Sequence, residues 1–136
     1  MRHPLQIAAV VLSLAFAVAA CATNPARPSA SLHYQRIVLS SEPVEQPLLE
    51  GPPQTAGMRS GRVVLKAGED MHRHSTNDNE ELLVFLAGTA RVVLGGDSVT
   101  MEHGQVLYIP PHLEHEVHND GPAVLQYIYT VAPASR

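Results

Sequence analysis

The sequence contains few of the features that large enzymes and nucleic-acid-binding proteins need. It has 136 residues, one cysteine, no tryptophan and only 4% aromatic residues. A chain of this length holds one small domain, so an α/β barrel of roughly 250 residues or a two-domain dinucleotide-binding enzyme is excluded. One cysteine cannot form an intrachain disulfide, so the fold must be stabilised by packing or by a metal.

Positive charge is also scarce. The sequence has nine Lys and Arg and thirteen Asp and Glu, which gives a formal net charge of −4. The basic residues are scattered singly, so a nucleic acid is not expected as a partner. Arg59, Arg62 and Lys66 are candidates for binding an anionic substrate, although scattered basic residues of this kind more commonly form a solvated face. The sequence also lacks a G-x-S-x-G elbow and a phosphate-binding glycine loop.

The first residues have the pattern of an export signal. Arg2 precedes an apolar run from Leu5 to Ala20, which is shorter than the roughly 20 residues that span a bilayer. Residues 1–20 are therefore predicted to be a signal peptide. Val18 to Cys21 resembles a bacterial lipobox, which predicts lipidation of Cys21 and an exported protein on the periplasmic side of the envelope, anchored to the outer membrane. Simple secretion, with cleavage near the same position, is the alternative.

The next segment is predicted to be a tether. Residues 21–35 carry the lipidated cysteine and a small, polar stretch, and residues 36–136 form the folded domain. Six of the eleven prolines lie between Pro25 and Pro53, so this part of the chain cannot be mainly central strand. The segment from Gln35 to Ser40 is the candidate for one edge strand.

From Arg59 onward, short apolar runs alternate with turn residues. Each run has the length of a strand and is rich in β-branched or aromatic residues. Glycine and proline clusters such as Gly95-Gly96-Asp97 and Pro110-Pro111 separate the runs. Seven or more strands at this spacing predict an all-β fold, an antiparallel sandwich or barrel of the jelly-roll kind. The predicted strands are Arg62 to Lys66, Leu82 to Leu86, Thr89 to Leu94, Ser98 to Met101, Val106 to Ile109, Glu116 to His118 and Val124 to Val131.

Three short stretches carry the residue types of a metal site. His72 and His74 are two apart, so on a regular strand both imidazoles point to one face. Glu80 and Glu81 follow, and His115 lies further along. Three imidazoles and one carboxylate suit one divalent transition metal (Fe, Mn, Zn, Ni or Cu), with coordination positions left for water or substrate.

These residues resemble the two motifs of the cupin superfamily. The second motif is matched from Gly104 through Pro110 and His115 to Asn119, with His112 standing where the family usually has glycine. In the first motif, Glu81 keeps the family's six-residue spacing to Gly88. Two spacings depart from the pattern: three residues instead of five separate Gly68 from His72, and six instead of three or four separate His74 from Glu81.

The resemblance covers about residues 63–131 and implies a small single-domain cupin with a double-stranded β-helix fold. It implies His72, His74, Glu81 and His115 as metal ligands. Glu80 and Asp78 are the alternatives to Glu81, which is preferred because a one-residue slip would turn the side chain to the opposite face. Cupins commonly pair through a sheet, so a homodimer is also expected.

The reaction is less determined than the fold, because cupins host many chemistries. The preferred function is a small metal-dependent oxygenase-type enzyme that acts on a small organic substrate. A Lewis-acid isomerase or lyase of sugars or hydroxy acids and a non-catalytic ligand- or metal-binding module are the alternatives. Tyr127, Tyr129, Glu80 and His112 are the candidate catalytic residues, because each offers a group for proton transfer.

Overall fold

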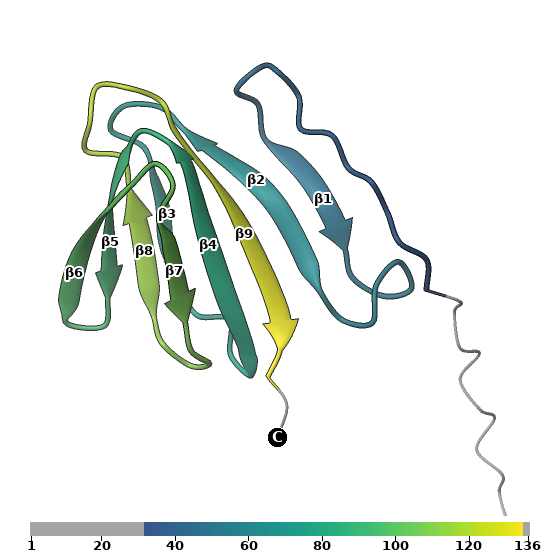
Figure 1. Ribbon diagram of the computed structural model, residues 1–136. Helices are drawn as coiled ribbons and strands as arrows, with labels where there is room; N and C mark the ends of the chain where they lie inside the picture. The colour runs from purple at the N-terminus through teal and green to yellow at the C-terminus, as the bar shows by residue number, and fades with distance from the viewer. Residues whose placement is uncertain (1–31, 135–136) are drawn as a thin grey trace, which may run out of the picture.

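Residues 32–134 are described by a computed structural model, in which they form two antiparallel sheets packed face to face (Figure 1). One sheet has the strand order β1-β2-β9-β4-β7 and the other has the order β3-β8-β5-β6. Within these residues no strand is parallel to its neighbour and no helix is present, which confirms the predicted all-β jelly-roll fold. In the same range, no helix is long and apolar enough to cross a membrane. The strands are β1 (Gln46–Glu50), β2 (Arg59–Leu65), β3 (Asp70–His74), β4 (Asn79–Ala87), β5 (Thr89–Leu94), β6 (Asp97–Glu102), β7 (Val106–Ile109), β8 (His115–His118) and β9 (Leu125–Pro133).

The predicted signal peptide, the lipidation site Cys21 and most of the predicted tether lie outside the described residues. The seven predicted strands correspond to β2 and to β4 through β9, with ends that differ by a few residues. The predicted edge strand over residues 35–40 is wrong, because the edge of this sheet is β1.

A buried arginine explains why this N-terminal part is irregular. The Arg62 guanidinium, on β2, donates hydrogen bonds to the carbonyl oxygens of Ser40, Glu42 and Val44 at 3.0, 2.8 and 2.9 Å. These hydrogen bonds hold residues 40–44 over the Arg62 side chain. The segment 40–44 crosses Arg62 as a strap and leaves that side chain 5% exposed.

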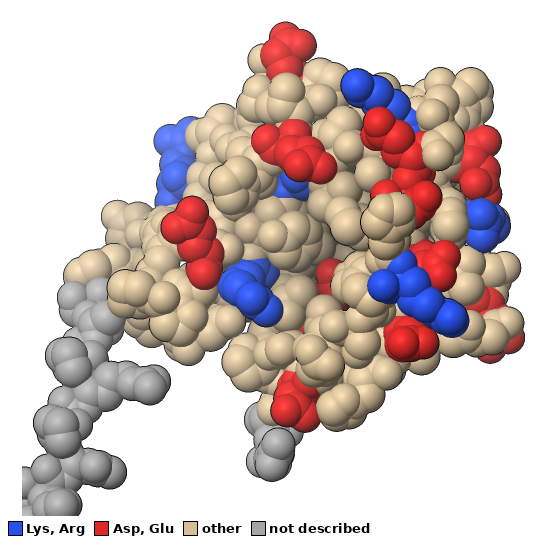
Figure 2. All heavy atoms as spheres, turned by 180° about the vertical axis from the view of Figure 1, so that it is seen from behind, with Lys and Arg blue, Asp and Glu red and all other residues tan. Residues whose placement is uncertain are grey.

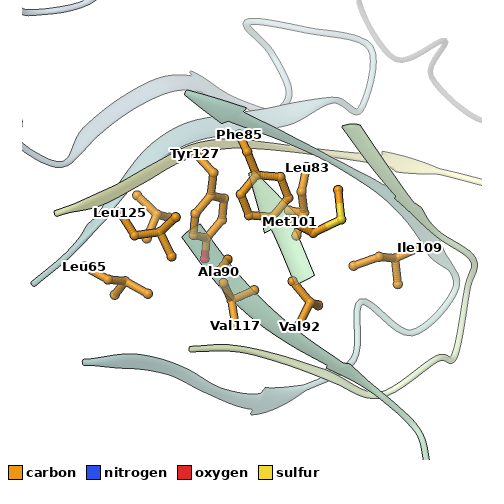
Figure 3. Packing of buried hydrophobic residues seen from close by; sticks show 11 residues of the cluster. Leu65, Leu83, Phe85, Ala90, Val92, Met101, Ile109, Val117, Leu125 and Tyr127 are labelled. Atoms are coloured by element: carbon orange, nitrogen blue, oxygen red, sulfur yellow. The ribbon is translucent and has the colours of Figure 1, made fainter. Parts of the chain in front are cut away.

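Alternation along the strands builds the core. On β4, Glu81, Leu83 and Phe85 are buried, whereas Leu82 between them is 38% exposed. The same period of two places one face of each strand between the sheets, where the side chains shown in Figure 3 pack together. The rings of Phe85 and Tyr127 lie 5.5 Å apart at their centroids, across the β4–β9 pair. This core fills the middle of the sandwich.

One end of the sandwich is closed by Asn119, which follows β8. Its side-chain amide donates to the carbonyl oxygens of Leu65 and Ala123 at 2.9 and 2.8 Å, and it accepts a hydrogen bond from the Gly121 amide. Asn119 thus ties the end of β2 to the turn before β9. The other end, where β2 begins and β3 ends, holds the polar residues of the predicted site.

Candidate metal centre

A cavity of about 470 Å³ opens at this second end of the sandwich. Strands of both sheets form its walls, and the loop between β3 and β4 lies at its edge. The lining residues are Arg59, Val63, Met71, His74, Ser75, Thr76, Asn77, Asn79, Glu81, Leu83, His115, Val117, Tyr127, Tyr129 and Val131. A cavity of this size fits a small organic molecule.

His74, Glu81 and His115 converge on the wall of this cavity. They come from β3, β4 and β8, and one ligand atom from each lies within 4.8 Å of the others. Glu81 is 5% exposed and His115 is 1% exposed. The two imidazole rings lie 4.3 Å apart at their centroids, since His74 and His115 are paired across the β3–β8 ladder. The structure therefore brings together three of the four predicted ligands.

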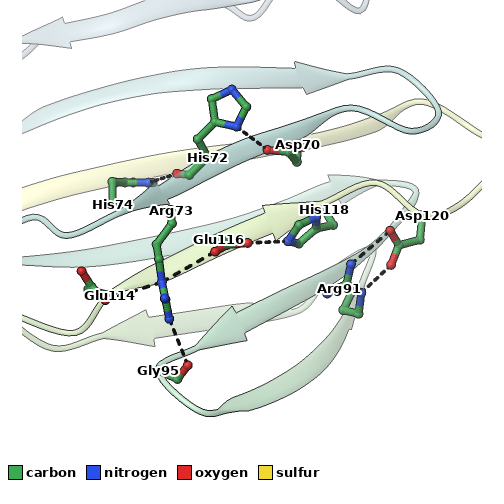
Figure 4. Close-up of polar contacts among 10 residues, drawn as sticks. All are labelled: Asp70, His72, Arg73, His74, Arg91, Gly95, Glu114, Glu116, His118 and Asp120. Atoms are coloured by element: carbon green, nitrogen blue, oxygen red, sulfur yellow. Dashed lines mark hydrogen bonds and ion pairs between the residues drawn. The ribbon is translucent and has the colours of Figure 1, made fainter.

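His72 lies apart from this group because β3 is irregular. The register of β3 against β8 shifts between Met71 and His74, so the strict alternation that would aim both histidines at one point is interrupted. The His72 side chain is 94% exposed and its ring nitrogen lies 2.8 Å from Asp70, as Figure 4 shows. The expected convergence of the two imidazoles is thus not observed. A ligand role for His72 stays a prediction.

Backbone carbonyl groups orient both inward histidines. The Nδ1 atom of His74 lies 2.7 Å from the carbonyl oxygen of His72, and Nδ1 of His115 lies 3.1 Å from that of Leu113. Each Nδ1–H donates to its carbonyl oxygen, which leaves the Nε2 lone pair of the neutral ring free. Second partners of this kind commonly hold metal-binding histidines in the required tautomer.

The carboxylate of Glu81 adds a third group that can donate an electron pair to a cation. Its Oε2 atom is buried without a hydrogen-bond donor among the described residues, although Nε2 of His115 lies 3.1 Å away. Burial lowers the pKa of His115. Glu81 and the Leu113 carbonyl group together raise it by more, so the pKa of His115 lies above its ordinary value. The site therefore attracts positive charge, and a divalent metal fits the two imidazoles and the carboxylate.

Two tyrosines line the same cavity. Tyr127 is 2% exposed, and burial followed by the nearby charge of Glu81 raises its pKa far above the ordinary value. Its phenol therefore stays protonated and can donate a hydrogen bond. Tyr129 lies one inward position further along β9, opposite Gly61, and a Cβ atom on Gly61 would come within 2.8 Å of the Tyr129 ring.

The other two candidate catalytic residues lie outside the cavity lining. The carboxylate of Glu80 accepts a hydrogen bond from the hydroxyl of Tyr108 at 3.2 Å. His112 is 69% exposed, pairs with Asp78 at 3.3 Å and has a φ of 64°, a backbone conformation that favours the glycine expected from the motif at this position. Between Glu80 and Glu81, the structure places Glu81 in the metal-binding group.

Sequence reasoning considered the loop between β3 and β4 only through Asp78, as an alternative ligand, and named Arg59 only among the scattered basic residues that could bind an anionic substrate. Ser75, Thr76 and Asn77 of this loop line the cavity, and no motif marks them. Arg59 could have been found by alternation, because it is in phase with the inward positions Gly61 and Val63 on β2.

Comparison with known proteins supports this assignment of fold. The sequence profile of the cupin domain family, Cupin_2, matches residues 61–131. No curated protein matches the sequence. Among solved structures, a cupin protein from Bacteroides fragilis has a TM-score of 0.64 at 19% identity, over 75% of this chain and 86% of that one.

Two further structures are similar. A cupin 2 conserved barrel domain protein from Salinispora arenicola has a TM-score of 0.61 at 21% identity, over 75% of this chain and 92% of that one. The Cnp3 cupin domain of Schizosaccharomyces pombe has a TM-score of 0.60 at 20% identity, over 66% of this chain and 64% of that one. At these identities the likeness establishes the fold.

Proposed function

The chain belongs to the cupin domain family, and from this premise we propose that it is a metal-dependent oxygenase-type enzyme acting on a small organic substrate. The observation that carries the proposal is the convergence of His74, Glu81 and His115 on the wall of a cavity. These three residues would hold the metal. Two imidazoles and one carboxylate form the ligand set of non-haem iron oxygenases, in which the metal keeps open positions that activate substrate and O₂. Iron is therefore the favoured metal, with Mn, Zn, Ni and Cu as the other candidates.

The residues around the metal-binding group suit a substrate with an apolar part. Val63, Leu83 and Val117 supply apolar wall next to the ligands, which excludes water from that part of the cavity. Tyr127 supplies a protonated phenol, which would donate a hydrogen bond to a substrate oxygen. The cavity therefore offers one polar end and apolar sides to a bound molecule.

The alternative of a Lewis-acid isomerase or lyase is less well supported by the same cavity. Such a reaction needs a side chain that accepts and returns a proton, in addition to the metal ligands. Among the described residues that line the cavity, Glu81 is the only carboxylate, and His74 and His115 are the only imidazoles. All three are assigned to the metal, and Tyr127 is held protonated.

The test is metal analysis followed by oxygen uptake. Protein purified without chelator or affinity-tag metal is expected to contain close to one equivalent of iron per chain. The iron-loaded protein, but not the zinc-loaded protein, is expected to consume O₂ with at least one member of a panel of small organic substrates. Bound metal without oxygen uptake would favour the non-catalytic binding module. Failure to bind any offered metal would contradict both the oxygenase and the Lewis-acid enzyme, and would leave a metal-free ligand-binding module.

We also propose that the protein acts in the bacterial cell envelope. The support is the sequence pattern that ends at Cys21, where acyl chains on the cysteine would hold the folded domain at the outer membrane on its periplasmic side. Mass spectrometry of the protein from bacterial membranes is expected to find a lipid-modified Cys21 as the first residue. An unmodified N-terminus near this position would instead indicate simple secretion.

A homodimer is the remaining proposal about partners. Leu82 and Tyr108 face each other across the β4–β7 pair and are 38% and 55% exposed, and Val106 on β7 is 54% exposed. A second copy that covered this apolar area would explain the apolar residues on both faces of β4. Light scattering is expected to give twice the mass of one chain, and the mass of a single chain would exclude the dimer.

A further inference from the structure

Arg59 lies in the same row of the sheet as the metal-binding carboxylate. Arg59 is paired with Val131 across β2 and β9, and Val131 is paired with Glu81 across β9 and β4. Directly opposed residues of neighbouring strands have their side chains on the same face of the sheet. The side chains of all three residues therefore face the cavity, and all three line it.

The spacing of this row matches a small molecule. Neighbouring strands lie about 4.8 Å apart, so two strand spacings separate the backbones of Arg59 and Glu81 by roughly 10 Å. Val131, between them, is a small apolar residue. A ligand that lies over Val131 could reach the metal-binding group with one end and the Arg59 guanidinium with the other.

Arg59 is also the one side chain of permanent positive charge among the described lining residues. Within the part of the chain that the structure describes, its guanidinium makes no hydrogen bond or ion pair. The other two basic candidates are placed differently: Arg62 is buried under the strap 40–44, and Lys66 is exposed beyond the opposite end of β2. Its cross-strand neighbour on β1 is the exposed Glu50, but no ion pair joins the two side chains among the described residues. On the face in Figure 2, basic side chains are interspersed with acidic ones.

We propose that Arg59 binds the carboxylate of a small organic acid whose other end faces His74, Glu81 and His115. The proposal rests on the proposed function, because the metal-binding group defines the second end of the ligand. A guanidinium presents two parallel N–H donors to a carboxylate, which gives orientation as well as affinity. The apolar side chain of Val131 and the phenol of Tyr129 accommodate the carbon skeleton between the two ends. The substrate class is therefore organic acids with an oxygen donor a few bonds away from the carboxylate.

The test uses zinc-loaded full-length protein, since zinc is redox-inactive, and a series of dicarboxylates (malonate, succinate, glutarate and adipate) with their monoamides. In calorimetric titrations, at least one diacid is expected to bind about 10- to 100-fold more tightly than its monoamide. Arg59→Gln is expected to abolish this preference and to bind zinc normally, whereas Arg59→Lys retains part of it. Arg91→Gln, which changes an exposed arginine outside the cavity, serves as the matched control and is expected to keep the full preference.

Two results would overturn the proposal while the proposed function stands: zinc-loaded wild-type protein that shows no preference for any diacid over its monoamide, or an Arg59→Gln variant that keeps the preference. Failure of zinc to bind to wild-type protein is a different result. It would contradict the metal site itself, and the ligand proposal would fall with it. Zinc stoichiometry and circular dichroism of each variant show whether the fold is retained.

Discussion

Each residue of the metal-binding group has a neighbour of the same type on the opposite face of the same strand. His74 is matched by His72 on β3, Glu81 by Glu80 on β4, and His115 by His118 on β8. The outward members have polar partners: Asp70 for His72, Tyr108 for Glu80 and Glu116 for His118. Figure 4 shows two of these outward pairs, on β3 and β8.

The inward members differ from the outward ones in burial and in hydrogen bonding. Two of them, Glu81 and His115, are almost completely buried, and Oε2 of Glu81 has no hydrogen-bond donor within residues 32–134. Buried polar atoms without partners are rare, because they cost the free energy of desolvation without recovering it. The same residue types thus have different roles on the two faces of the strands. The outward ones make ion pairs or hydrogen bonds near the surface, which are of small energetic value, and the inward ones are placed to bind a cation.

The largest effect, on metal affinity, is expected from neutralising the inward one of the two glutamates on β4. Glu81→Gln removes the charged ligand and is expected to lower metal affinity by roughly 100-fold or more, because even residues that only support a ligand change affinity by 10- to 100-fold. Glu80→Gln, the matched control, should leave the affinity within about twofold. Competition with a metallochromic chelator measures both. Equal losses in the two variants would mean that the face of the strand does not determine the ligand.

The histidine pairs sharpen the same comparison. His115→Ala is expected to remove the bound metal and His118→Ala to retain it, as measured by metal stoichiometry. His72→Ala is the informative variant on β3, since the sequence motif predicts a ligand there and the structure places the side chain outside the cavity. We expect His72→Ala to keep the metal and His74→Ala to lose it. Loss in both would establish a fourth ligand and a rearrangement of β3 on metal binding.

The difference between β4 and β3 also shows how far the sequence could predict this site. On β4, regular alternation and the distance from Glu81 to Gly88 were sufficient to select the inward carboxylate. On β3, the same rule failed for His72, because the register shifts between Met71 and His74. A shift of this kind depends on how β3 meets β8, a contact between segments about 45 residues apart that no local period encodes.

The fold was more predictable than the N-terminal part of the domain. Strands β4 to β9 are separated by turns that each contain glycine or proline, so period and turn chemistry locate them to within a few residues. The strap 40–44 depends instead on one long-range contact, the guanidinium of Arg62 with three carbonyl groups. Nothing in residues 35–50 marks that contact, so the edge strand was placed too early in the chain.

Arg62 is an exception to this comparison, because it is on the outward face of its strand but is buried. Its contribution to stability therefore tests whether burial is what matters for a polar residue, whichever face it is on. Arg62 lies on β2 next to the inward residues Gly61 and Val63, on the face away from the cavity, yet it is 5% exposed. Arg62→Met would remove the guanidinium donor from three carbonyl groups, of which that of Glu42 still accepts from the Val44 amide. The change is expected to lower the free energy of unfolding by about 2–3 kcal/mol. Urea unfolding measures the change. A loss within experimental error would show that the strap contributes nothing to stability.

A smaller effect is expected from filling the space beside Tyr129. A Cβ atom at Gly61 would lie 2.8 Å from the Tyr129 ring, closer than carbon atoms normally approach. Gly61→Ala is therefore expected to shift Tyr129 in the cavity and to cost about 1–3 kcal/mol of stability. Gly96→Ala, where nothing lies within 4 Å of the added atom, is the control and should be close to neutral. A Gly61→Ala variant as stable as the Gly96→Ala variant would contradict the close packing of this wall.

The smallest effect is expected on the outer face of the second sheet, where Arg91 pairs with Asp120. Both side chains are well exposed, at 42% and 58%, so water and salt screen their attraction. The hydrogen bond from Arg91 holds the pKa of Asp120 below its ordinary value of 3.8. A lowered carboxyl pKa stabilises the folded state at pH values above the ordinary pKa, and this contribution disappears as the pH falls through the lowered pKa.

At neutral pH and physiological salt, Arg91→Met should therefore leave the melting temperature unchanged within replicate scatter. Any deficit at low salt should vanish in acid, below the pKa of Asp120. A lower melting temperature that persisted in acid and in high salt would show that Arg91 contributes through packing of its aliphatic stem and not through its charge. Arg91 would then belong with the buried residues in this comparison.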